Sequence, residues 1–339
     1  MPNFWMISDR NLVLDSLGVA TGFGDDRDEL TYWTSDASTA DELAIAINWK
    51  KVNSNSFKSQ LIQATDQFPK FVHGDNERQK HVSLFIHGYN NGWQDAARRY
   101  GSIATELFNK PNGLGICVSF DWPSYGSILG YYPDRDHAKD CSGDLSSVLG
   151  DVYDWLLIKQ KEAIQDPNLA CRAKVSVIAH SMGSYLLQKA ASSTWTRKNQ
   201  PLLSSLINQA LMIAADVDND LFDVGSSDAL DGNALSNVSY RITSLYSGRD
   251  AVLGASAGLK NFGARRLGRS GLSTSPPVMK SNVWQIDCSS FFPAGISGSE
   301  VHSAYFLTAG TLDLMRKLLI GIDRKVLDKL GATRGTVWP

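Results

Sequence analysis

Apolar runs rich in β-branched residues alternate along the chain with longer stretches in which apolar residues recur at helical spacing. The runs predict strands at residues 81–87, 115–120, 174–179, 209–215, 240–246 and 283–287. The helical spacing predicts helices at about 93–109, 146–164, 185–191 and 303–319. This alternation predicts an α/β fold with a mostly parallel central sheet and helices on both of its faces. The chemistry of such sheets lies at the carboxyl ends of the strands.

The first 75 residues follow a different pattern. Residues 4–7 and 30–33 have the character of short strands, with a turn rich in glycine and aspartate at 22–28 between them. We interpret them as antiparallel strands at the N-terminal edge of the same sheet, so that a single domain covers residues 1–339.

Two long connections, 122–145 and 251–281, are predicted to be loops or cap-like insertions near the functional site. The second contains five cations and no acid: Lys260, Arg265, Arg266, Arg269 and Lys280. It is either a solvated basic loop or a segment that binds an anion.

The composition is that of a globular protein with a sizeable core, because 43% of the 339 residues are hydrophobic and 20% are charged. A formal net charge of −2 gives no reason to expect a nucleic-acid partner. No run of about 18 apolar residues is present, so we expect no integral membrane segment. The N-terminus lacks a signal-peptide pattern and the four cysteines lack metal-ligand spacing, which favours a cytoplasmic protein. Cys117 and Cys288 fall in strand-like runs and are expected to be buried.

One serine stands where a strand runs directly into a tight turn and then into a helix. Residues 179–183 are A-H-S-M-G, an A-x-S-x-G form of the nucleophile elbow in which Ala179 and Gly183 are the small flanking residues. Such a turn lifts the serine oxygen to a place where a substrate carbonyl can reach it. Because a hydroxyl is a good nucleophile only beside a base, Ser181 needs a histidine partner and an acid that orients this histidine.

The order of residues along the chain selects the partners of Ser181. On a doubly wound sheet with this chemistry, the nucleophile is followed first by the acid and then by the histidine. Of the six histidines only His302 follows Ser181, and it lies in a predicted loop that opens a helix. Asp250, beyond the carboxyl end of the penultimate strand, is our preferred acid. Asp216 and Asp218, just after the preceding strand, are the alternatives, with capping of the next helix as their other role.

The negative charge on an attacked carbonyl oxygen requires two backbone N–H donors. We expect one from Met182, the residue after the serine, and the other from Tyr89, where Gly88 lets the backbone approach a substrate closely. Gly88 is therefore also a candidate substrate-binding residue. His87, just before this turn, is expected to brace the loop. His180 lies beside the serine and is expected either to line the pocket wall or to pack inside.

Aromatic residues gather in the connection after residues 115–120: Trp122, Tyr125, Tyr131 and Tyr132. Trp122 and Tyr125 are candidate substrate-binding residues, because a cluster of rings beside the site would form an apolar pocket. The equal alternative is that the rings attach the connection to the core.

Five motifs carry a resemblance to a known family: F-I-H-G-Y-N at 85–90, F-D-W-P-S at 120–124, A-H-S-M-G at 179–183, Y-S-G-R-D at 246–250 and V-H-S-A-Y-F at 301–306. In order and spacing they resemble the bacterial α/β-hydrolases grouped as DUF900, over about residues 80–310. The resemblance implies the α/β-hydrolase fold and a triad of Ser181, Asp250 and His302. The alanine that opens the elbow also resembles that of certain bacterial lipases.

The predicted function is a serine hydrolase that cleaves a carboxylic ester through an acyl-serine intermediate, as a carboxylesterase or a lipase-like enzyme. The substrate would be a small-molecule or lipid ester, and we expect no metal and no cofactor, because no motif for either is present. Two alternatives remain open, namely an acyltransferase with the same acyl-enzyme and a non-catalytic binding scaffold on the same fold. The sequence assigns neither the natural substrate nor the oligomeric state.

Overall fold

The computed structural model describes residues 2–70, 75, 78–89, 91–124, 131–197, 205–273 and 280–329. The chain divides into two compact units, Met1–Val175 and Ser176–Pro339. Each unit has its own strands, helices and buried side chains. The expectation that a single domain covers the whole chain stays a prediction.

The described part of the first unit contains five strands, in the spatial order β3 (Lys50–Val52), β2 (Ala20–Ser35), β1 (Phe4–Leu14), β5 (Gly115–Asp121) and β4 (Lys80–Ile86). β1 pairs antiparallel with β2, and β2 with β3. β5 runs parallel to both β1 and β4. The prediction of antiparallel strands at the N-terminal edge, beside parallel ones, is therefore confirmed.

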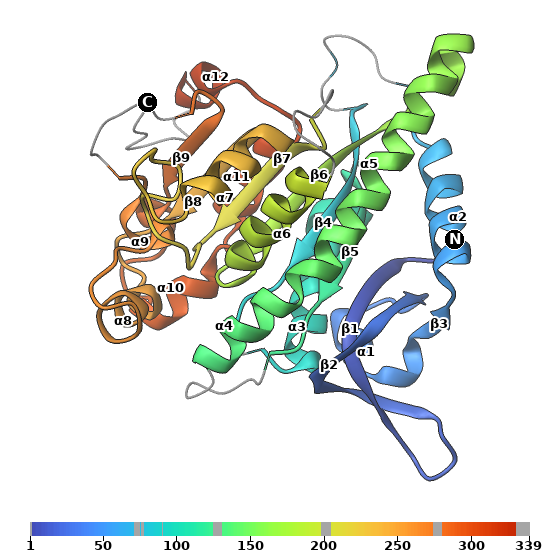
Figure 1. Ribbon diagram of the computed structural model, residues 1–339, viewed down its shortest axis with the longest axis horizontal. Coiled ribbons are helices and arrows are strands. Elements are labelled where there is room, and N and C mark those ends of the chain that lie inside the picture. Colours follow the sequence, from blue (N-terminus) through green and yellow to red (C-terminus); the bar gives the residue numbers. More distant parts are fainter. Residues whose placement is uncertain are drawn as a thin grey trace. The chain divides into compact units, whose positions relative to one another are not determined.

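β1 and β2 form a much longer hairpin than the sequence suggested. Its turn lies at residues 15–19, so the segment 22–28 belongs to strand β2 and the turn predicted there is wrong. The far end of the hairpin extends away from the rest of the first unit (Figure 1), and Leu17 at this end is 86% exposed. A ribbon with two solvated faces needs no alternation of apolar and polar residues, and this alternation is the pattern that reveals a strand in a sequence.

The helices of the first unit are α1 (Ala40–Leu43), α2 (Ser54–Asp66), α3 (Trp93–Ile103), α4 (Tyr131–Asp140) and α5 (Ser142–Gln165). A π-helical turn, Ala104–Asn109, continues α3, and single 3₁₀ turns lie at Ala46–Asn48 and Pro167–Leu169. The hydroxyl of Tyr100 on α3 donates to the carbonyl of Cys117 at 2.8 Å and accepts from the N–H of Trp5 at 2.9 Å. One buried tyrosine thus joins α3 to β5 and β1.

The connection 122–145 is more regular than a loop, because α4 and the start of α5 occupy most of its described part. α4 buries only Tyr131, Asp134 and Ala138. So few apolar contacts leave a weak helical pattern in the sequence.

The second unit contains β6 (Ala173–His180), whose first three residues fall in the first unit, followed by β7 (Ile207–Ile213), β8 (Ser239–Tyr246) and β9 (Val283–Asp287). These strands lie side by side in chain order and all run parallel (Figure 1). The helices are α6 (Gly183–Arg197), α7 (Ala229–Val238), α8 (Ala251–Ala255), α9 (Leu267–Ser270), α10 (Gly298–Ala304), α11 (Ala309–Leu319) and α12 (Arg324–Lys329). The α/β class with mostly parallel strands is confirmed.

Two segments of the second unit differ in detail from the prediction. The single helix expected at 303–319 is two helices, α10 and α11, separated by a turn in which Leu307 is 79% exposed. The connection 251–281 contains α8, a π-helical turn at Ser256–Lys260 and α9. His302 therefore lies inside a helix, and the loop predicted around it is wrong.

The four cysteines form no disulfide. Cys117 and Cys288 are buried as predicted, and Cys141 is buried as well. Burial raises the pKa of these three thiols far above its ordinary value. Among the described residues, every helix is too short or too polar to traverse a bilayer.

Candidate active site

The turn after β6 holds Ser181 with its backbone in the left-handed region, at a φ of 52°. The N–H of Ser181 donates to the carbonyl of Ile213 at 2.9 Å. The carbonyl of Ser181 accepts from the N–H groups of Ser184 at 3.0 Å and Asp216 at 3.1 Å. A non-glycine residue at positive φ is strained and persists only where its surroundings maintain it. This strain is typical of a nucleophile elbow.

Met182 links Ser181 to the start of α6. The N–H groups of the first turn of a helix have no partner within the helix, and the helix dipole favours negative charge there. The side chain of Met182 is fully buried, and the hydroxyl of Ser184 donates to the carbonyl of buried Ala179 at 3.2 Å. The buried side chain of Met182 and the hydrogen bond of Ser184 fix the backbone around the N–H of Met182, which was predicted to bind an oxyanion.

Asp250 ends the turn after β8 and caps helix α8. Its Oδ1 accepts from the N–H of Leu253 at 2.9 Å, and its Oδ2 lies 2.7 Å from Nδ1 of His302. The guanidinium of Arg269 donates to the backbone carbonyl of Asp250. Because the side chain is fully buried and both oxygens are engaged, the carboxylate has one orientation.

His302 lies in the last turn of α10, a helix that begins with a capping box formed by Ser297 and Glu300. When Nδ1 donates to the carboxylate of Asp250, the neutral ring carries its lone pair on Nε2. That nitrogen is the one with which the histidine of a catalytic triad takes a proton. Only 8% of His302 is exposed, so the contact with Asp250 is made largely out of water.

His180 joins the serine turn to α10. Its Nε2 donates to the backbone carbonyl of His302 at 2.9 Å, and the two imidazole rings lie 4.8 Å apart between centroids. Phe306 also packs edge-on against the ring of His180, at 5.1 Å. His180 is buried, which favours internal packing over pocket lining. The structure thus brings His302 into contact with Asp250 and places it against the neighbour of Ser181.

Asp216 is engaged by Arg266 and Ser256. Its Oδ1 accepts from Nε of Arg266 at 2.9 Å and from the hydroxyl of Ser256 at 2.7 Å, and all three side chains are buried. Asp218 pairs with the same guanidinium. A buried arginine needs such a partner, because an uncompensated buried charge is costly. The geometry therefore favours Asp250 over either alternative acid.

Two of the cations in the segment 251–281, Arg266 and Arg269, have partners within the protein. Arg266 is buried against two carboxylates, and Arg269 holds the backbone of Asp250. Arg266 is thus an internal group of the unit, whereas Arg269 is only partly buried. Within the described ranges, no group of three or more His, Cys, Asp or Glu side chains could hold a metal ion.

In the first unit, the turn that carries Gly88 and Tyr89 is braced by buried side chains. The ring of His87 stacks on Trp122, with 5.2 Å between centroids and 6° between planes. Nε1 of Trp122 donates to the carbonyl of His87 at 2.9 Å, and Nδ1 of His87 lies 2.8 Å from the carbonyl of Gly88. His87 therefore has the expected bracing position. Trp122 is fully buried in the same brace, which favours attachment to the core over pocket lining.

Tyr125, the other candidate pocket residue, lies outside the described residues. Tyr131 is buried and packs edge-on against Tyr89 at 5.6 Å and Tyr132 at 5.5 Å. Tyr132 is half exposed. Part of the aromatic cluster thus supports the turn at Tyr89.

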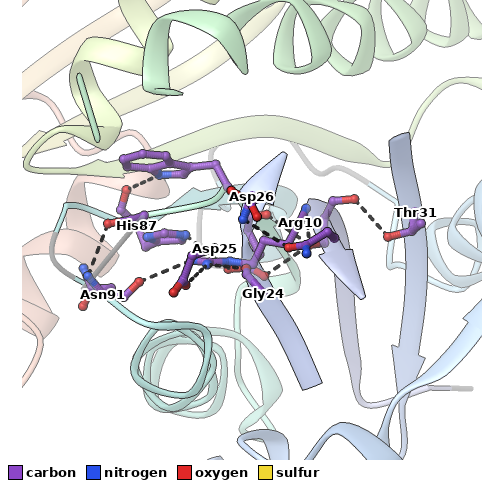
Figure 2. A network of polar contacts seen from close by, with 12 residues as sticks. Arg10, Gly24, Asp25, Asp26, Thr31, His87 and Asn91 are labelled. Carbon is purple, nitrogen blue, oxygen red and sulfur yellow. Dashed lines mark hydrogen bonds and ion pairs between the residues drawn. The ribbon is translucent and has the colours of Figure 1, made fainter. Parts of the chain in front are cut away.

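A buried ion-pair network extends from this turn to β1, with Arg10 at its centre (Figure 2). Arg10 donates from Nε to Asp121 at 3.1 Å, from Nη1 to the carbonyl of Gly24 at 3.0 Å and from Nη2 to the carbonyl of Asn91 at 3.2 Å. Burial alone raises the pKa of Asp121, but the charge of Arg10 and the hydrogen bond from His87 outweigh it and hold this pKa below its ordinary value. Arg10 was not predicted from the sequence. The available signal was Asp121, in the F-D-W-P-S motif.

Comparison with known proteins gives one family and several distant likenesses. The model of the family described as alpha/beta hydrolase of unknown function (DUF900) matches residues 63–319. An uncharacterized protein of Nostoc sp. strain PCC 7120, alr1448, is 27% identical over 164 aligned positions, and the match covers 42% of this chain. The match spans 35% of that relative's length.

Three solved structures are similar at low identity. An esterase of Pyrobaculum calidifontis is 13% identical with a TM-score of 0.29, over 78% of this chain and 94% of its own. An acylaminoacyl peptidase of Pyrococcus horikoshii is 14% identical with a TM-score of 0.32, over 90% and 48%. A lipase-esterase related protein of Clostridium acetobutylicum is 13% identical with a TM-score of 0.24, over 52% and 78%. Scores this low carry no argument about activity, whereas the family match covers most of the chain. This protein belongs to the DUF900 family of α/β hydrolases and has the α/β-hydrolase fold.

Proposed function

We propose that the protein is a serine hydrolase that cleaves a carboxylic ester through an acyl-serine intermediate, as a carboxylesterase or a lipase-like enzyme. The observation that carries the proposal is the 2.7 Å contact between His302 Nδ1 and Asp250 Oδ2, in the same unit as a serine at positive φ. A strained backbone costs folding free energy and is concentrated at functional sites, and a buried carboxylate that orients an imidazole is the arrangement that activates a nucleophilic serine.

In the proposed first step, Nε2 of His302 takes the proton of the Ser181 hydroxyl while Oγ bonds to the ester carbonyl carbon. The carbonyl oxygen becomes an anion, which the N–H of Met182 stabilises. The tetrahedral intermediate then expels the alcohol, which takes the proton from His302, and acyl-Ser181 remains. Throughout, Asp250 stays ionised and stabilises the imidazolium.

In the second step, a water molecule gives a proton to His302 and bonds to the acyl carbon. Collapse of this second tetrahedral intermediate returns the proton to Ser181 Oγ and releases the carboxylic acid. The second oxyanion donor in both steps is proposed to be the N–H of Tyr89, whose turn is braced by His87 and Trp122.

Nitrophenyl esters from acetate to palmitate test the proposal directly. The parent protein is expected to hydrolyse some of them, and Ser181→Ala is expected to lower kcat about 10⁶-fold. Ser102→Ala is the matched control, because its hydroxyl donates to the carbonyl of Arg98 within α3 and takes no part in the proposed chemistry. A Ser181→Ala protein that hydrolyses these esters at the parent rate would contradict the proposal. The chain length of the best ester separates a small-ester enzyme from a lipase-like one.

A fluorophosphonate probe separates an enzyme from an inert scaffold, because it labels only an activated hydroxyl. Labelling is expected at Ser181 in the parent and in Ser102→Ala, and it is expected to be lost in Ser181→Ala. An unlabelled parent protein would favour the scaffold. Adding an alcohol that competes with water then shows whether the acyl group is released as acid or transferred.

A further inference from the structure

We propose that Arg249 is a positioning residue of the site, because its guanidinium holds the chain segment that leads into α10 and thereby keeps His302 against Asp250. The inference rests on the proposed function and deepens it. Arg249 directly precedes Asp250 in the chain, and its side chain connects the segment of the acid to the segment of the base.

Each hydrogen bond that the guanidinium of Arg249 donates to the segment 289–296 goes to a backbone carbonyl. Nη1 reaches the carbonyls of Ser289 at 3.3 Å and Phe292 at 2.9 Å. Nη2 reaches Pro293 at 2.7 Å, and Ala294 and Ile296 at 3.4 Å each. These five acceptors follow one another along the segment 289–296. A planar fork of N–H donors can hold several carbonyls at once, which a single ammonium group cannot.

The held segment ends where the helix of His302 begins. Ser297, the residue after the last carbonyl, is the N-cap of α10. At the next position, a side chain on Gly298 would stand 2.7 Å from Cβ of Ala251 and 3.0 Å from the carbonyl of Arg249. α10 therefore starts in close contact with the turn of the acid, and glycine is required for this approach.

A small displacement of α10 would disrupt the pair. The contact between Nδ1 of His302 and Oδ2 of Asp250 is a single 2.7 Å hydrogen bond, and a catalytic group must be held within about 0.5 Å of its productive geometry. A misplacement of about 1 Å can cost about 10²-fold in rate. Loss of the Arg249 contacts is thus expected to lower kcat while KM changes little.

Arg249→Met tests the inference, because methionine keeps an unbranched apolar stem and removes every donor. With the best nitrophenyl ester, kcat is expected to fall about 10- to 100-fold while KM stays within about twofold of the parent. Arg249→Lys keeps the charge but not the planar fork of donors, so its kcat is expected to lie between that of the parent and that of Arg249→Met. Arg98→Met is the matched control, because Arg98 forms exposed ion pairs with Asp41 and Asp95. This variant is expected to leave kcat unchanged.

Proton NMR provides a second readout that loss of stability alone would not change. In the parent, the Nδ1 proton of His302 shared with Asp250 is expected as a far-downfield resonance, absent in His302→Gln. This resonance is expected to weaken in Arg249→Met at a temperature where the variant is folded by circular dichroism. If Arg249→Met does not fold, Arg249→Lys is used for both measurements.

The inference fails if the folded variant keeps both the parent kcat and the parent resonance. Failure of the proposed function has a different signature, because the parent itself then neither hydrolyses esters nor reacts with the fluorophosphonate. In that case the resonance still decides whether Arg249 positions His302. A weakened resonance supports the positioning role, and an unchanged one overturns it.

Discussion

The side chain of His180 is joined to the backbone of His302, since its Nε2 donates to that carbonyl at 2.9 Å. His180 is the residue directly before Ser181, so the bond links the serine turn to α10. The two rings also pack against each other. The residue beside the proposed nucleophile therefore helps to fix the proposed base.

Loss of this bond should weaken both stability and turnover. In His180→Leu the carbonyl of His302 loses its donor in a buried place, which is expected to cost about 1–3 kcal/mol in the free energy of unfolding. His180→Gln is the control, since its terminal amide nitrogen can replace Nε2 as the donor. Denaturant unfolding and ester kinetics on both variants measure the difference. Equal stability and equal kcat for Leu and Gln at this position would refute a role for the hydrogen bond.

Asp250 and Asp216 should respond differently to the same substitution. Asp250→Asn is expected to lower kcat about 10⁴-fold, because an amide favours the wrong tautomer of the histidine. Asp216→Asn leaves buried Arg266 without full compensation and is expected to cost about 3–5 kcal/mol in stability, with turnover per folded molecule retained. Kinetics normalised to the folded fraction distinguish the two. The reverse pattern would show that Asp216 is the acid.

The backbone N–H of Tyr89 can be removed by proline. Tyr89→Pro is expected to lower kcat about 10²- to 10³-fold, the usual effect of losing one oxyanion donor. The preceding Gly88 tolerates the conformations that proline imposes on its neighbour. Tyr89→Phe keeps the N–H and should stay near the parent rate. If Tyr89→Pro is folded and as active as Tyr89→Phe, the second oxyanion donor lies elsewhere.

Asp9 on β1 gives a pH dependence to the stability of the first unit. Burial raises the pKa of this carboxyl from 3.8 to about 7, and the nearby charges of Asp144 and Asp121 add to the shift, whereas a hydrogen bond from Cys141 opposes it. The folded state therefore prefers the neutral carboxyl. The contribution of Asp9 to stability is full below about pH 4 and is lost as the pH rises to about 7, at about 1.4 kcal/mol per pH unit.

The variant Asp9→Asn should remove this slope, because the amide is neutral at every pH. It is expected to be more stable than the parent at pH 8, with a smaller advantage at pH 5. Urea unfolding at the two pH values measures this, with Asp41→Asn on the surface as the control. An Asp9→Asn protein that is less stable than the parent at pH 8 would show that the charged carboxylate is favoured after all.

The parts of the site that depend on local pattern were predictable from the sequence. A strand followed by a small-residue turn and a helix specifies the elbow at Ser181, and the order of residues along the chain leaves His302 as the only candidate base. The observed contact between His302 and Asp250 agrees with that choice.

Other parts depend on residues that are distant in the chain. Asp216 forms an ion pair with Arg266, 50 positions further on. The ring of Trp122 stacks on His87, 35 positions before it. The length of the β1–β2 hairpin was hidden because the ribbon has no buried face along its far end. No pattern at Arg249 reveals five carbonyl acceptors, since backbone groups carry no sequence signature.

The positive φ of Ser181 limits which side chains the elbow accepts. Threonine carries the same hydroxyl, but a β-branched residue is strongly disfavoured in this conformation. Cysteine has no branch and fits the same backbone. A lineage that inherits this turn can therefore exchange its oxygen for sulfur, but it cannot acquire a secondary alcohol without first rebuilding the main chain.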